Sequence, residues 1–145
     1  MRRRLAVLLL VPFMAAAAHS QPPLRVACIG DSITYGDKID DRETRSYPAA
    51  LARLAQGRLA VGNFGVNGAT AISTFFRTWT DTLACRQALA FQPDAAVVML
   101  GINDLLGFRD RLDEYPAALR AVAARFQALP SKPRLFLCTL TPIAP

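Results

Sequence analysis

Runs of consecutive apolar residues alternate along this chain with segments in which apolar residues recur every three or four positions. The runs predict buried strands, and the recurring pattern predicts helices that pack one apolar face against a sheet. Four strands are expected, one ending at Gly30 and the others at 59–61, 95–100 and 135–140. The third run is apolar at successive positions, which is typical of a strand buried on both faces of a parallel sheet.

Helices are expected between the strands. Ser46 precedes one with Pro48 in its first turn and Gly57 at its end, and Thr80 or Asp81 caps another that runs to Phe91. A third opens at 114–116, with an apolar stripe formed by Tyr115, Leu119, Val122, Phe126 and Leu129. The charged segment 37–45 has no apolar period and is expected to be a solvated loop. This alternation predicts a three-layer α/β/α sandwich around a parallel flavodoxin-like sheet.

The first twenty residues have the layout of a secretory signal peptide. Arg2, Arg3 and Arg4 precede an apolar run from 5 to 18, and small residues allow cleavage after Ala18 or Ser20. This run falls short of the roughly 20 apolar residues that cross a bilayer, so no stable membrane span is expected. We therefore expect a leader over 1–20, a domain over 21–145, and export to the periplasm or the medium.

Composition and charge argue against several classes of partner and cofactor. The formal charge of +6 falls to about +3 without the leader, and no basic cluster is interleaved with aromatic residues, which argues against nucleic-acid binding. The three cysteines form no C-x-x-C pair, and the acids of 37–45 lack the spacing of a calcium loop. Neither a disulfide framework, a metal nor another cofactor is expected.

Candidate chemistry gathers where three strands end. The loops after the first, second and third strands carry Ser32, Gly68 and Asn103, and these loops share one edge of a parallel sheet. Acyl transfer needs a nucleophile together with hydrogen-bond donors where negative charge develops. Ser32 could be that nucleophile, while its own N–H, the N–H of Gly68 and the amide of Asn103 could form an oxyanion hole.

Three short motifs resemble the first three sequence blocks of the GDSL or SGNH hydrolase family. They are GDSIT at 30–34, NFGVNGAT at 63–70 and GIND at 101–104, in the order of the family and at similar spacing. The resemblance is strongest to secreted lysophospholipase-like and acetylesterase-like members, and it implies small acyl esters of sugars or lipids as substrates. It implies that Ser32 is the nucleophile and that Gly68 and Asn103 are oxyanion donors. Asp31 and Asp104 are expected to fix their loops as hydrogen-bond acceptors.

The chain departs from the family in lacking a D-x-x-H pair, whose histidine would act as general base. Its only histidine is His19, before the first strand. A serine without a base is a poor nucleophile at neutral pH. The resemblance therefore implies an amino-terminal portion of a hydrolase, truncated after the fourth strand and inactive alone. The fourth strand is expected to form an unpaired apolar edge, and the isolated chain to be marginally stable.

Simpler interpretations stand beside these. Ser32 can be a helix cap, and Gly68 and Asn103 can be ordinary loop residues. Tyr35, Phe75 and Trp79, like the neighbouring aromatic Phe76, can contact the substrate or simply pack. As an alternative function, the turn after the first strand could hold a phosphate or nucleotide without catalysis, although no G-x-G-x-x-G or G-K-[ST] spacing is present.

Overall fold

A computed structural model of the chain describes residues 21–75 and 77–139. The expected leader with His19, the aromatic residue Phe76 and the last residue of the expected fourth strand, Leu140, lie outside the described residues. The elements are, in order, β1 Leu24–Gly30, α1 Ser32–Tyr35, α2 Arg42–Arg45, α3 Tyr47–Leu54, β2 Leu59–Gly65, the 3-10 turn η1 Trp79–Asp81, α4 Leu83–Ala90, β3 Ala95–Met99, α5 Ile102–Gly107, the 3-10 segment η2 Arg109–Glu114, α6 Tyr115–Gln127 and β4 Arg134–Leu137.

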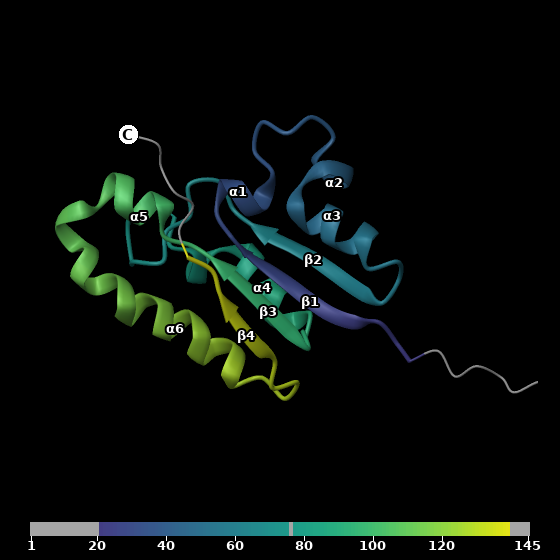
Figure 1. Cartoon of the computed structure of the whole chain (residues 1–145). Helices are drawn as coiled ribbons and strands as arrows, with labels where there is room; N and C mark the ends of the chain where they lie inside the picture. The colour runs from purple at the N-terminus through teal and green to yellow at the C-terminus, as the bar shows by residue number, and fades with distance from the viewer. Residues whose placement is uncertain (1–20, 76, 140–145) are drawn as a thin grey trace, which may run out of the picture.

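The four strands form one parallel sheet in the order β2-β1-β3-β4 (Figure 1). Gly30 at the end of β1 lies opposite Gly65 of β2 on one side and opposite Met99 of β3 on the other. The loops that follow these three strands therefore leave the same edge of the sheet side by side. This arrangement confirms the predicted parallel α/β fold, and β1 lies between β2 and β3.

Helices lie on both faces of the sheet, as Figure 1 shows for α3 and α6. On one face, Ala27 and Ile29 of β1 belong to the core cluster that also contains Cys85 and Ala88 of α4 and Val122 and Phe126 of α6. Cys28 points to the opposite face because side chains alternate along a strand. On that face Thr34 Oγ1 and Tyr47 OH of α3 lie 3.4 Å apart in a hydrogen bond.

The apolar stripe predicted for the third helix is confirmed in α6. Val122 and Phe126 are fully buried, and Tyr115, Leu119 and Leu129 pack against the same core. The ring of Phe126 stacks against Trp79 with 6.3 Å between centroids, and Trp79 Nε1 donates a 2.9 Å hydrogen bond to Phe64 O. The segment after β2 is thereby anchored in the core.

Several boundaries differ from the sequence prediction. The second strand continues to Gly65, and the loops after β1 and β3 open with the short helices α1 and α5. The solvated segment 37–45 contains the single turn α2. Thr82 caps α4, rather than Thr80 or Asp81, because its extended backbone allows Oγ1 to accept a hydrogen bond from Cys85 N. Ser46 precedes α3 as expected, but its buried side chain makes no capping bond.

β4 forms one edge of the sheet. Within the part of the chain that the structure describes it pairs only with β3, and Phe136 and Leu137 are 47% and 56% exposed. β3 also departs from the expectation of burial on both faces. Ala96 and Val98 are buried against the helices, whereas the side chains of the alternate positions are only half-buried. On the face where α3 lies, helical cover is thus confined largely to β1 and β2.

Candidate active site

Ser32 lies at a sharp turn between β1 and α1. The preceding residue, Asp31, caps α1 by accepting a 2.9 Å hydrogen bond from Ile33 N at Oδ1. Asp31 is only 1% exposed, and burial raises the pKa of its carboxyl against the opposing effect of the Ile33 N–H. Ser32 itself is half-buried as the first residue of the helix, at the edge of the sheet where β1 ends.

Gly65 allows α1 to sit directly on the end of β2. A Cβ placed at Gly65 would overlap the backbone nitrogen of Tyr35 and the carbonyl carbon of Thr34. Asn63, two residues earlier in β2, also holds the helix, because its Nδ2 donates to Tyr35 O at 3.3 Å. The absence of a side chain at Gly65 thus fixes how close Ser32 comes to the loop that follows β2.

Gly68 occupies a tight turn in that loop. Ala69 N donates to Val66 O at 3.0 Å, which closes a four-residue turn with Gly68 in its third position. Gly68 has a φ of +74°, the left-handed value that a type II turn requires at this position. In such a turn the N–H of the third residue is not used in closing the turn. The residue is also exposed, so its N–H is available at the surface.

Asn103 joins the third loop to the second. It lies in the first turn of α5, and its Nδ2 donates a 2.9 Å hydrogen bond to Ala69 O, the residue after Gly68. An amide nitrogen carries two hydrogens, so one N–H of Asn103 remains beyond this bond. Asn103 is therefore bonded to the residue that directly follows Gly68.

Asp104 holds the same loop more firmly. Its side chain is completely buried and accepts hydrogen bonds from Ala71 N at 3.0 Å and from Ile72 N at 2.8 Å. These bonds link residues more than thirty positions apart in the sequence. The expectation that Asp31 and Asp104 fix their loops as hydrogen-bond acceptors is met by both carboxylates.

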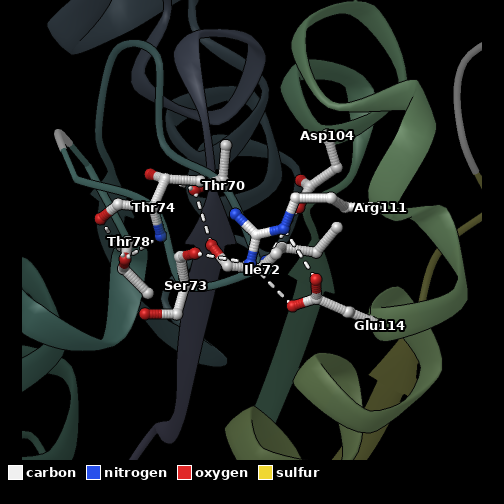
Figure 2. A network of polar contacts seen from close by, with 8 residues as sticks. All are labelled: Thr70, Ile72, Ser73, Thr74, Thr78, Asp104, Arg111 and Glu114. Carbon is white, nitrogen blue, oxygen red and sulfur yellow. Dashed lines mark hydrogen bonds and ion pairs between the residues drawn. The ribbon is translucent and has the colours of Figure 1, made fainter.

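A second brace lies on the outer side of the loop, as Figure 2 shows. Arg111 Nη2 donates to Ser73 O at 3.2 Å, and its guanidinium pairs with both carboxylate oxygens of Glu114 at 2.6 and 2.7 Å. The hydrogen bonds from Arg111 lower the pKa of the exposed Glu114 carboxylate. Inside the loop, Thr70 Oγ1 donates to Ile72 O at 2.9 Å. This brace is not predictable from the sequence, where its only local signal is an oppositely charged pair at i and i+3.

The aromatic candidates lie in different environments. Tyr35 is half-buried beneath the guanidinium of Arg42, 4.0 Å from its ring centroid, and Phe75 is 95% exposed on the loop after Gly68. Trp79 is fully buried, because its indole stacks in the core and bonds to a backbone carbonyl. Trp79 therefore has a packing role, which corrects its place among the candidate substrate contacts.

Neither a metal-ligand cluster nor a membrane-spanning helix occurs in the described residues. No group of three or more His, Cys, Asp or Glu side chains in 21–75 and 77–139 converges as a metal site. Across the same residues, every helix is too short or too polar to cross a bilayer. The cysteines in this part of the chain are all free thiols, with Cys28 and Cys85 buried and Cys138 exposed.

Comparisons with known proteins assign the class. The sequence pattern of the GDSL-like Lipase/Acylhydrolase family matches residues 28–145. An acetylxylan esterase of Xylanibacter ruminicola is 35% identical over 143 residues, which cover 86% of this chain and 30% of that protein. The chain therefore spans about a third of this curated relative.

Solved structures agree with this assignment. AlinE4, an esterase of the SGNH-hydrolase family, is 26% identical with a TM-score of 0.59, over 81% of this chain and 59% of its own. A protein of Desulfitobacterium hafniense described as belonging to the G-D-S-L lipolytic family shares the fold at 23% identity and a TM-score of 0.58, over 78% of this chain and 57% of its own.

The fold and these similarities define the family of the chain. The chain belongs to the GDSL-like lipase/acylhydrolase family, and its fold is that of the SGNH hydrolases. The family resemblance of its three sequence motifs is thereby confirmed.

Proposed function

We propose that this chain carries the nucleophile and the oxyanion-stabilising groups of a serine esterase. The observation that carries the proposal is the bond from Asn103 Nδ2 to Ala69 O, which holds the amide beside Gly68 at the edge where Ser32 leaves β1. In the reaction, Ser32 Oγ attacks the ester carbonyl carbon. The N–H groups of Ser32 and Gly68 and the amide of Asn103 stabilise the oxyanion. Its collapse breaks the ester C–O bond, and the leaving alkoxide takes up the proton lost by Ser32. Water then hydrolyses the acyl-serine, which releases the acid and restores Ser32. Removing one such donor typically costs about 10² to 10³ in rate.

A base must accept the proton of Ser32. Residues 21–145 contain no histidine for this role, because His19 is the only histidine of the sequence. Asp31 and Asp104, the two buried carboxylates, each accept backbone hydrogen bonds and serve the structure. We therefore expect the 145-residue chain to hydrolyse nitrophenyl acetate at close to the background rate. The proposal takes 21–145 as part of an SGNH-hydrolase domain and 1–20 as a leader for export.

Small acyl esters of sugars or lipids are the proposed substrates. The similarity to a protein named acetylxylan esterase favours acetylated sugars among them. Tyr35 and Phe75 are proposed as contacts for the group that carries the ester, because they are accessible on the loops that bear Ser32 and Gly68. Trp79 has no part in this contact.

A fluorophosphonate reagent tests the nucleophile directly, because it bonds covalently to an activated serine. The 145-residue chain would be treated with the reagent with and without imidazole, a small diffusible base. Mass spectrometry would locate the adduct. We expect labelling of Ser32 that imidazole accelerates, and none in Ser32→Ala, whereas a form of the protein that continues past Pro145 and supplies its own base should label without imidazole.

The outcomes separate the two candidate functions. Labelling spread over several serines, or labelling equal in Ser32→Ala, would exclude an esterase nucleophile at this position. Saturable binding of inorganic phosphate at the loop after β1, with Ser32 unlabelled under every condition, would favour the phosphate-binding module instead.

A further inference from the structure

Arg77 makes an unusual contact beside the candidate oxyanion donor Gly68. Its Nη1 donates a 2.6 Å hydrogen bond to Asn67 O, the carbonyl oxygen of the peptide group whose nitrogen belongs to Gly68. The Cδ of Arg77 lies 3.5 Å from the position that a Cβ of Gly68 would take. The side chain of Arg77 therefore packs directly along the Asn67–Gly68 peptide.

The position of Arg77 is fixed by its own backbone. Arg77 O accepts a hydrogen bond from Thr70 N at 3.0 Å. This bond brings Arg77 back to a residue only two positions after Gly68. Asn67 is held from the other side, because its Nδ2 donates to Asp37 Oδ1 at 2.8 Å. Both partners of the short contact are thus held in place by bonds that do not depend on it.

The geometry of the peptide group connects this contact to the reaction. In a trans peptide the carbonyl oxygen and the N–H point in opposite directions, so Arg77 approaches the Asn67–Gly68 peptide from the side away from its N–H. Hydrogen bonds in a chain polarise one another, and a bond from a charged donor is stronger than a neutral one. Within the part of the chain that the structure describes, Arg77 forms no ion pair that would neutralise its charge.

We propose that Arg77 is a positioning residue that orients and polarises the Asn67–Gly68 peptide, so that the N–H of Gly68 becomes a stronger oxyanion donor. The inference rests on the proposed function for its catalytic consequence, but the polarisation itself is a property of the folded chain. Strengthening a donor has a smaller effect than supplying one. With bond polarisation of about 10–30%, loss of the guanidinium is expected to slow acylation of Ser32 by about three- to tenfold.

The test uses the 145-residue chain labelled with ¹⁵N, with Arg77→Met and Arg77→Lys as variants. Arg86→Met is a matched control, since Arg86 is also exposed and donates through Nη1 to a backbone carbonyl, that of Asp81 at 3.4 Å, away from Gly68. We expect the amide ¹⁵N resonance of Gly68 to move upfield in Arg77→Met, to stay near its original position in Arg77→Lys, and to be unchanged in Arg86→Met. Fluorophosphonate labelling of Ser32 in imidazole should slow in parallel.

The outcomes distinguish this inference from the proposed function. A Gly68 resonance that moves no further in Arg77→Met than in Arg86→Met would overturn the inference. Slower labelling without a change at Gly68 would also overturn it, because Arg77 would then act on the reagent itself. Absence of Ser32 labelling in every protein, wild type included, would overturn the proposed function, while the Gly68 resonance would still decide the role of Arg77.

Discussion

Replacing Asp104 should loosen the loop that carries Gly68, and the cost follows from its hydrogen bonds. The buried carboxylate satisfies two backbone N–H groups, those of Ala71 and Ile72. Leaving a buried donor without a partner costs about 1–3 kcal/mol, and bonds to a charged group lie in the upper part of that range. Asp104→Ala leaves two such donors, so we expect a loss of about 3–5 kcal/mol in the free energy of unfolding. That is a large part of the 5–15 kcal/mol typical of a domain.

The conservative variant Asp104→Asn gives a graded result. Its amide oxygen can accept one of the two bonds, but its NH₂ group then faces the other N–H, so a loss of about 2 kcal/mol is expected. Urea unfolding followed by circular dichroism measures the free energy of unfolding of both variants. Asp113→Ala is the control, because Asp113 is exposed, and its free energy of unfolding is expected within about 0.5 kcal/mol of wild type. Hydrogen exchange should also quicken at Ala71 and Ile72. A loss below 1 kcal/mol in Asp104→Ala, or unchanged exchange at these amides, would refute the reasoning.

Two further predictions concern the packing beneath the site. Gly65→Ala should displace α1 through overlap with the backbone of Tyr35, which should lower the free energy of unfolding by about 2–4 kcal/mol and abolish Ser32 labelling. Gly107→Ala is the control, because a Cβ there meets open space, and it should cost less than about 1 kcal/mol in the same urea titration. Equal losses in the two variants would contradict this account. Burial raises the pKa of the Cys28 thiol from 9.0 to about 11, because the folded chain favours the protonated thiol. The stability that this preference contributes is complete below pH 9 and is lost as the pH rises through 11. The free energy of unfolding should therefore fall by up to about 3 kcal/mol over that interval, with a smaller fall in Cys28→Ala; an identical fall in both proteins would exclude the thiol as its source.

The fold was predictable because its signals are local. A few neighbouring residues are enough to predict a strand from the apolar run 95–100 and a helix from the apolar stripe that ends at Leu129. The edge that carries Ser32, Gly68 and Asn103 followed from topology, since the loops after neighbouring parallel strands share one side of a sheet. Pattern and topology together were enough to indicate where the candidate site lies.

The contacts within the site could not be predicted in this way. The bond from Asn103 to Ala69 spans 34 residues, and nothing near either residue specifies the partner. The burial of Trp79 depends on where Phe126 arrives from α6, so an aromatic residue on a loop became part of the core. The cap of α4 was one of three adjacent polar residues, and only the backbone conformation selected Thr82.

The single tryptophan of the sequence has a practical consequence through its position. Trp79 is shielded from water, stacked on Phe126 and bonded to Phe64, at the point where the segment bearing Gly68 meets the core. Its intrinsic fluorescence therefore reports on the docking of that segment without any engineered label. A red shift of the emission at a denaturant concentration where the helical signal is still intact would show that the segment bearing Gly68 separates from the core before the helices unfold.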